Sequence, residues 1–306
     1  TGDRVSEPVG TVLAREGGSY RILVDGVEHV AILRGKAKRA EDRAIAGDRV
    51  TIDPATLGEE TLAITGVAPR TSLLARRVPD GRGTRPVAAN VDQVVVVIAA
   101  ADPDPIPQLM DRLLVVAEAN EIPCWVVVNK VDLGSVAPIE AHLRASGYRV
   151  LATAARAGEG VEALRAELVG RISVLTGPSG AGKSSLLNAL EPGLGLRIGA
   201  VSAKVGRGTH TTVTATMIPM VGGGFVVDTP GFSEVGVWDL ARGELDSCFP
   251  EFREFIGSCR FGDCLHRIEP GCAIRQAVEA GTIPAERHAS YLAILAELDA
   301  LPESWE

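Results

Sequence analysis

The chain has 306 residues, of which 46% are hydrophobic and 23% are charged, and its formal net charge is −8. This length allows two or three domains with cores of their own, and the acidity argues against a uniformly basic nucleic-acid-binding protein. No apolar run approaches the roughly 20 residues of a membrane span, and the N-terminus lacks a secretory pattern. We therefore expect a cytoplasmic protein with no membrane partner.

Residues 1–67 have the pattern of a small all-β barrel. Short β-like segments alternate with glycine-containing turns such as Gly17-Gly18 and Asp25-Gly26. The segments are residues 10–14, 20–24, 28–33, 48–52 and 62–67. Their number and length favour an oligonucleotide-binding (OB) barrel, although an SH3-like barrel would give much the same pattern.

Positive charge gathers in two clusters in the N-terminal part of this acidic chain. The first lies in the predicted barrel and consists of Arg34, Lys36, Lys38 and Arg39. The second lies in residues 68–90, which we interpret as a linker from their prolines and glycines, and consists of Arg70, Arg76, Arg77, Arg82 and Arg85. A solvated face and a surface that contacts a phosphate backbone both fit such clusters.

Residues 91–240 alternate between strands and helices. Apolar strands are expected at 94–100, 124–129, 148–152 and 172–175, and helices at 111–120, 139–146, 161–169 and 183–190. Strands without polar alternation indicate a parallel sheet that is covered on both faces. A hairpin of segments 213–220 and 224–227 follows, and residues 241–306 are expected to be mostly helical.

A glycine-rich loop joins the strand that begins at Ile172 to the following helix. It contains Gly177-x-x-x-x-Gly182-Lys183-Ser184, the phosphate-binding loop of P-loop NTPases. Its backbone N–H groups would surround the phosphates, Lys183 would reach the β- and γ-phosphates, and Ser184 would bind Mg²⁺. The predicted phosphate-binding residues are Gly177, Pro178, Ser179, Gly180, Ala181, Gly182, Lys183, Ser184 and Ser185.

A base-recognition motif, Asn129-Lys130-x-Asp132, ends the 124–129 strand. The Asp132 carboxylate can accept hydrogen bonds from guanine N1–H and N2–H₂, a pair that adenine does not offer. Lys130 would lie along the ring and Asn129 would brace the loop. After the next strand, Ala154-Ala155 resembles in degenerate form the Ser-Ala pair whose backbone N–H meets guanine O6 in GTPases.

The sequence Asp228-Thr229-Pro230-Gly231 follows an apolar strand and fits a γ-phosphate sensor. Asp228 would lie near Mg²⁺, and the N–H of Gly231 would meet the γ-phosphate. The motifs occur in the order base, phosphate, sensor, whereas GTPases usually begin with the phosphate loop. Parallel strands can be rejoined through new loops without disturbing a pocket, so we predict a circularly permuted GTPase domain.

The segment from Gly206 to Met217 lies between the phosphate loop and the sensor, where a switch supplies a threonine to Mg²⁺ and the γ-phosphate. We prefer Thr212, with Thr211 as the close alternative, which makes Ser184, Thr212 and Asp228 the predicted Mg²⁺ ligands. Phe232 stands where Ras-type enzymes carry a water-orienting glutamine, which leaves His210 as the nearest polar candidate unless it is an ordinary loop histidine. The candidate catalytic residues are His210, Lys183 and Thr212.

A cysteine- and histidine-containing segment lies near the C-terminus. It reads Cys259-x₄-Cys264-x-His266-x₅-Cys272. Three thiolates and one imidazole complete a tetrahedral set, so we predict one closed, structural Zn²⁺ site, with buried free thiols as the alternative.

Together these motifs resemble those of the RsgA/YjeQ family of circularly permuted GTPases. The resemblance rests on the strings "AANVDQVVVV", "NKVDL", "GPSGAGKSSLLNAL", "HTT", "DTPGF" and "CRFGDCLHRIEPGC". It implies an OB barrel at 1–67, a basic linker at 68–90, a permuted GTPase domain at 91–240 and a helical zinc-binding domain at 241–306. The Ala154-Ala155 pair and the overall acidity depart from the family pattern.

The resemblance also implies a function. GTP would be hydrolysed to GDP by a late assembly factor of the small ribosomal subunit, with hydrolysis stimulated by the subunit and coupled to release. A catalytic histidine in the switch would match His210, and we expect a monomer. The candidate rRNA contacts are Arg34, Lys36, Lys38, Arg39, Arg76 and Arg77.

Two alternatives remain at this point. A guanylate-kinase-type enzyme could use the same phosphate loop, but it has no role for the base motif, the sensor or the zinc cluster. An RNA-binding assembly factor could hold GTP as a slow switch, and Phe232 favours that interpretation because it cannot orient water.

Overall fold

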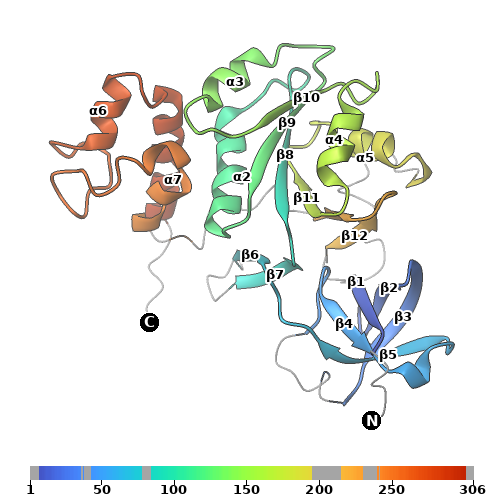
Figure 1. The fold of residues 1–306 in the computed structure, drawn as a ribbon. Helices are drawn as coiled ribbons and strands as arrows, with labels where there is room; N and C mark the ends of the chain where they lie inside the picture. The colour runs from blue at the N-terminus through green and yellow to red at the C-terminus, as the bar shows by residue number, and fades with distance from the viewer. Residues whose placement is uncertain are drawn as a thin grey trace, which may run out of the picture.

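The computed structural model describes residues 7–35, 37, 43–77, 84–194, 215–229, 240 and 242–300 of the chain. Three regions follow one another: an N-terminal β-barrel, a central α/β region and a C-terminal helical region (Figure 1). This confirms the predicted multidomain architecture. None of the helices in the described part of the chain is long and apolar enough to cross a membrane.

The barrel is closed by five strands in the order β1-β2-β3-β5-β4. They are β1 (Val9–Glu16), β2 (Ser19–Val24), β3 (Val27–Leu33), β4 (Arg49–Ile52) and β5 (Thr61–Val67). Alternate side chains such as Val12, Ile22 and Ile52 point inward and form a core of their own. All pairs are antiparallel except β3 with β5. This five-stranded closure confirms the OB-type barrel.

The segment interpreted as a linker contains regular structure. Strands β6 (Leu73–Arg77) and β7 (Thr84–Ala89) form an antiparallel hairpin. Leu74 and Ala88 are fully buried in the same cluster as Leu13 of the barrel. This hairpin was not predicted, because the arginines and prolines of the segment masked two short apolar stretches that pack between the barrel and the α/β region.

The central sheet has six strands in the order β10-β9-β8-β11-β13-β12. They are β8 (Gln93–Ala99), β9 (Cys124–Asn129), β10 (Val150–Thr153), β11 (Ile172–Thr176), β12 (Thr216–Pro219) and β13 (Phe225–Asp228). Every neighbouring pair is parallel except β12 with β13. The carboxyl ends of the five parallel strands therefore meet at one edge of the sheet, which we call the carboxyl edge.

Helices cover both faces of this sheet. The β8 residues alternate between the two sides: Val94 and Val96 pack with α2 (Pro107–Ala119) and α3 (Ala137–Leu143), and Val95 packs on the opposite face. The opposite face carries α4 (Val161–Leu168) and α5 (Lys183–Leu190). The continuous apolar strands are explained by this double cover.

The C-terminal region packs against the outer side of α2 (Figure 1). It contains α6 (Ala273–Glu279), α7 (Ala285–Ala300) and the short 3₁₀ turns η4 (Arg242–Glu244), η5 (Asp246–Cys248) and η6 (Pro250–Phe252). Two further 3₁₀ turns, η1 (Pro54–Thr56) and η2 (Pro192–Leu194), lie in the earlier regions. Phe249 stacks on Phe252, Tyr291 contacts both rings at steeper angles, and all three join the cluster that includes α2.

A buried ionic network crosses this interface. The Arg287 guanidinium of α7 donates to Asp111 Oδ1 of α2 at 2.6 Å and to the two oxygens of Glu251 at 2.5 and 3.1 Å. His142 of α3 lies 2.8 Å from Asp111 Oδ2. Arg287 and Asp111 are 1% and 0% exposed, so this pairing occurs away from water. Four elements from two regions are thereby tied together.

Candidate active site and metal centre

The phosphate loop lies at the carboxyl edge, between the end of β11 and the start of α5. Gly177 has φ +143°, and a Cβ there would collide with the backbone carbonyl of Val97 in neighbouring β8. Gly182 has φ +92°, and a Cβ there would collide with the side-chain amide of Asn129. Glycine is needed at both positions because the loop passes so close to its neighbours.

Asn129 braces three loops from the end of β9. Its Nδ2 donates to the carbonyl of Ala181 in the phosphate loop at 3.0 Å. Its Oδ1 accepts from Thr153 Oγ1 at 3.2 Å and from the N–H of Ala155 at 3.1 Å. The side chain is only 1% exposed, so these bonds fix the base motif and the Ala154-Ala155 loop to the phosphate loop.

One cavity of about 370 Å³ holds most of the predicted nucleotide-binding residues. Asp132 of the base motif and Lys183 of the phosphate loop line the same space although they follow different strands, β9 and β11. The other lining residues that the sequence predicted are Asn129, Lys130, Ala155, Ser179, Gly180, Gly182, Ser184 and Ser185. A cavity of this size, lined mainly by charged, amide and hydroxyl side chains, suits a small polar ligand.

Lys183 and Asp228 perturb each other at the phosphate end of the site. Burial lowers the pKa of Lys183, partly offset by the charge of Asp228. Burial raises the pKa of Asp228 to about 6, against the opposing charge of Lys183. In the structure the Lys183 ammonium donates to the carbonyls of Gly177 and Pro178. The Asp228 carboxylate and the Ser184 hydroxyl are both hard oxygen donors, the kind of ligand that Mg²⁺ prefers.

Some predicted residues lie elsewhere. Asp228 and Ala154 do not line the cavity, and Ala154 is fully buried with its N–H bonded to the carbonyl of Glu159. Gly177, Pro178 and Ala181 form the loop backbone without lining the cavity. The positions predicted for the switch and sensor, His210, Thr212 and Gly231, lie outside the described residues.

The cavity also has lining residues that sequence reasoning missed. They are Asp102 from the loop after β8, Leu133 directly after the base motif and Arg156 directly after Ala155. Leu133 is 57% exposed despite being apolar. Leu133 and Arg156 could have been found by their adjacency to motifs, whereas nothing in the local sequence marks Asp102.

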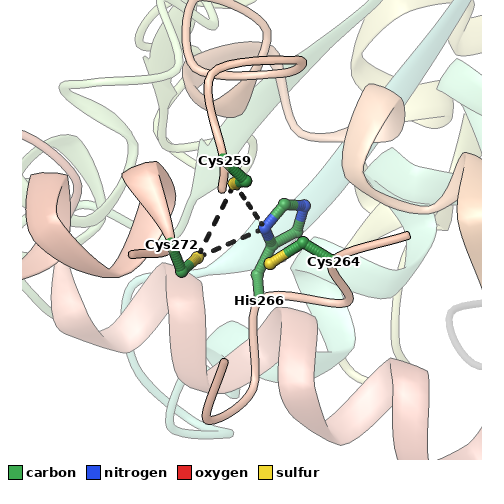
Figure 2. Close-up of side chains that lie close together, drawn as sticks. All are labelled: Cys259, Cys264, His266 and Cys272. Carbon is green, nitrogen blue, oxygen red and sulfur yellow. Dashed lines mark hydrogen bonds between the residues drawn. The ribbon is translucent and has the colours of Figure 1, made fainter. Parts of the chain in front are cut away.

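The four predicted zinc ligands come together with tetrahedral spacing (Figure 2). Cys259 Sγ lies 3.9 Å from Cys272 Sγ, and His266 Nδ1 lies 3.6 Å from Cys259 Sγ and 3.4 Å from Cys272 Sγ. All four ligand atoms, including that of Cys264, fall within 4.8 Å of one another. Zinc bonds of about 2.3 Å to sulfur and about 2.0 Å to nitrogen put tetrahedral ligand atoms roughly 3.5–3.8 Å apart, so the cluster fits one structural Zn²⁺.

Backbone N–H groups and a carboxylate surround the cluster in positions that stabilise thiolate ligands and orient the imidazole. The N–H groups of Ala273 and Arg275, in the first turn of α6, donate to Cys259 Sγ and Cys272 Sγ, each at 3.4 Å. His266 Nε2 lies 3.3 Å from Asp246 Oδ2. A carboxylate on the outer nitrogen orients a ligating imidazole, and N–H donors stabilise thiolates.

The basic clusters are only partly described. Arg34 is exposed at the end of β3, while Lys36, Lys38 and Arg39 lie outside the described residues. Arg76 and Arg77 belong to β6 by their backbone. Arg70 has a structural role instead: it donates to the fully buried Asp48 carboxylate at 2.8 and 3.0 Å.

Comparison with known proteins places the chain in a family. The family described as "RsgA GTPase" matches residues 67–238. A protein of Gemmatimonas aurantiaca named "Small ribosomal subunit biogenesis GTPase RsgA" is 50% identical over 94% of this chain and 97% of its own length. A protein of Moorella thermoacetica with the same name is 44% identical over 97% and 99%.

Solved structures agree with this assignment. YjeQ from Thermotoga maritima has a TM-score of 0.80 and 33% identity, covering 97% of this chain and 100% of its own. YloQ, described as a circularly permuted GTPase, has a TM-score of 0.76 and 28% identity, covering 99% of each chain. The motif order, the cavity and these likenesses agree: the chain belongs to the RsgA family of circularly permuted GTPases.

Proposed function

We propose that this GTPase acts in the maturation of the small ribosomal subunit, with stimulation of GTP hydrolysis by the subunit and release of the factor after hydrolysis. Its relatives of 50% and 44% identity, matched over nearly their whole length, carry the name of small-subunit biogenesis GTPases. The observation that carries the enzymatic part is the single cavity shared by Asp132 and Lys183. GTPase family membership leaves no place for the nucleotide-kinase alternative.

In this proposal the cavity divides into a base end and a phosphate end. Asp132 accepts the guanine N1–H and N2–H₂ hydrogen bonds, and Lys130 lies along the ring. Backbone N–H groups of the loop from Gly177 to Gly182 bind the phosphates, and Asn129 holds the two ends in register through its bonds to Ala181 and Ala155.

At the phosphate end, Lys183 would turn from its loop carbonyls to the β- and γ-phosphates. Ser184 and Asp228, with Thr212 from the switch, would hold Mg²⁺, which supplies neutralisation of the charge that develops on the phosphates. His210 would orient the attacking water. The burial that lowers the pKa of Lys183 also strengthens its attraction to a polyanion, because less water screens the charge.

The test of the proposed function compares GTP turnover with and without purified small ribosomal subunits. We expect slow basal release of phosphate and a large stimulation by small subunits, with large subunits as the matched control. Equal rates in all tubes would instead support a factor that holds GTP as a slow switch.

The proposed role of His210 has its own test. His210→Ala should abolish the stimulated turnover and leave the Kd for GDP unchanged, because water orientation contributes to hydrolysis and not to binding. His29→Ala, in strand β3 of the barrel, is the matched control. Full turnover by His210→Ala would remove this histidine from the mechanism.

A further inference from the structure

The loop between β8 and α2 forms a wall of the nucleotide cavity through Asp102. The Lys130 ammonium donates to the backbone carbonyl of Asp102. On the other side, a Cβ added to Gly180 would lie 3.0 Å from Cδ of Pro103. The loop therefore lies between a residue of the base motif and a residue of the phosphate loop.

In a bound nucleotide, this loop would lie beside the ribose. When the base is held beside Lys130 and the phosphates beside Gly180, the ribose lies between them. A ribose has no charge, but its two hydroxyls are hydrogen-bond donors. A carboxylate accepts two such bonds at once, as the acidic residue of dinucleotide-binding folds does.

The charges in the cavity leave Asp102 without another role. Asp102 and Asp132 are the two acidic residues that line the described part of the cavity, and Asp132 is assigned to the base. Lys130 reaches the backbone oxygen of Asp102 and not its carboxylate, and no ion pair among the described residues includes that carboxylate. Asp102 is exposed at this wall, so its carboxylate can exchange bound water for the hydroxyl donors of a ligand.

We propose that the Asp102 carboxylate accepts hydrogen bonds from the ribose hydroxyls of the bound guanine nucleotide, and so discriminates ribonucleotides from deoxyribonucleotides. This inference rests on the proposed function, because it assumes that the cavity holds a guanine nucleotide. It assigns the specificity for the sugar to a residue outside the base and phosphate motifs.

The experiment measures the Kd of the full-length protein for GDP, 2′-deoxy-GDP and 3′-deoxy-GDP by calorimetry. The diphosphates avoid hydrolysis during the measurement. Hydrogen bonds to a charged acceptor contribute about 1.5–3 kcal/mol, which corresponds to about 10–100-fold in Kd. We expect at least one deoxy form to bind about 10-fold more weakly than GDP.

Asp102→Asn is the informative variant. Asp102 has φ +46°, a conformation that asparagine tolerates well, and the residue is exposed, so the loop should keep its shape. In this variant the affinity for GDP should fall toward the affinities for the deoxy forms. The affinities for the deoxy forms themselves should change little. Asp104 is an exposed residue of the same loop that does not line the cavity. The Asp104→Asn variant should therefore keep the wild-type preference for GDP over the deoxy forms.

Two results would overturn the inference. One is an unchanged preference for GDP over both deoxy forms in Asp102→Asn. The other is an equal gain in affinity for all three ligands, which would mean that Asp102 acts only by charge on the phosphates. If wild-type protein bound none of the three, the proposed function itself would fail, and that outcome is distinguishable from the loss of sugar preference alone.

Discussion

The zinc cluster and the nucleotide cavity are built in opposite ways. The zinc ligands all lie between Cys259 and Cys272, in one loop that ends at the N-cap of α6. The cavity takes its walls from four separate segments, at residue 102, residues 129–133, residues 155–156 and residues 179–185. The first site can form from one short segment with its metal, whereas the second exists only when the parallel sheet is assembled. The two sites should therefore respond differently to the same kind of damage.

Zinc removal should have the largest effect. Cys272→Ser, or chelation of the metal, should unfold the C-terminal region, because metal binding supplies on the order of 10 kcal/mol to such domains. Metal analysis of the wild type should give about one Zn per chain, as expected for a closed four-ligand site. GDP affinity should fall by less than about 10-fold, or about 1.4 kcal/mol, because none of the four zinc ligands lines the described part of the nucleotide cavity.

Cys248→Ser is the matched control, because Cys248 is buried in the same region but lies outside the cluster. It should retain zinc. A metal-free wild type with an intact C-terminal region would contradict the assignment, as would loss of zinc in the control.

Arg287→Met should produce the next largest effect, at the interface between the two regions. It leaves Asp111 and Glu251 buried without their cation, which costs about 3–5 kcal/mol. Burial alone would raise the pKa of Asp111, but its hydrogen bond to His142 and the charge of Arg287 outweigh this and lower it. The measurement is urea unfolding of wild type and variant over a range of pH.

The sign of the pH dependence follows from the lowered pKa. The contribution of Asp111 is complete above the ordinary aspartate pKa and is lost as the pH falls through the lower folded value. The loss in free energy of unfolding caused by Arg287→Met should therefore be largest near neutral pH and become smaller in acid. A deficit that grows in acid would show that the network does not stabilise the ionised carboxyl.

Asp132→Asn should affect the cavity and leave the zinc cluster intact. Loss of the two charge-assisted hydrogen bonds to guanine should weaken GDP binding about 10–100-fold. Xanthosine diphosphate should bind better to the variant than to the wild type, because the asparagine amide can donate to the added xanthine oxygen. An unchanged preference for guanine would remove Asp132 from base recognition.

Arg253→Ala should have the smallest effect. Arg253 also joins the C-terminal region to α2, donating to Glu118 at 2.7 Å, but its side chain is 50% exposed. Exposed pairs contribute about 0–1 kcal/mol. Thermal unfolding should place this variant close to wild type, and a loss as large as that of Arg287→Met would mean that burial does not decide the strength of these contacts.

Much of this molecule could be predicted from short-range patterns. The alternation of β8 residues between two buried faces, the glycines of the phosphate loop and the spacing of the zinc ligands all depend on residues close in sequence. The hairpin β6–β7 could not be predicted, because Leu74 and Ala88 gain their burial from Leu13 and the sheet. The role of Arg70 was also hidden, since its partner Asp48 lies in the barrel.

The sequence by itself determined the motifs, their permuted order, the types of elements that carry them and the chemistry of the metal ligands, because each is encoded over a few residues. Only the tertiary structure decided that Asp102 borders the nucleotide cavity and that Arg287 is buried between two carboxylates. Such placements depend on which distant segments the sheet and the helices bring together. In a pocket assembled at the ends of parallel strands, neighbours in space are seldom neighbours in the chain.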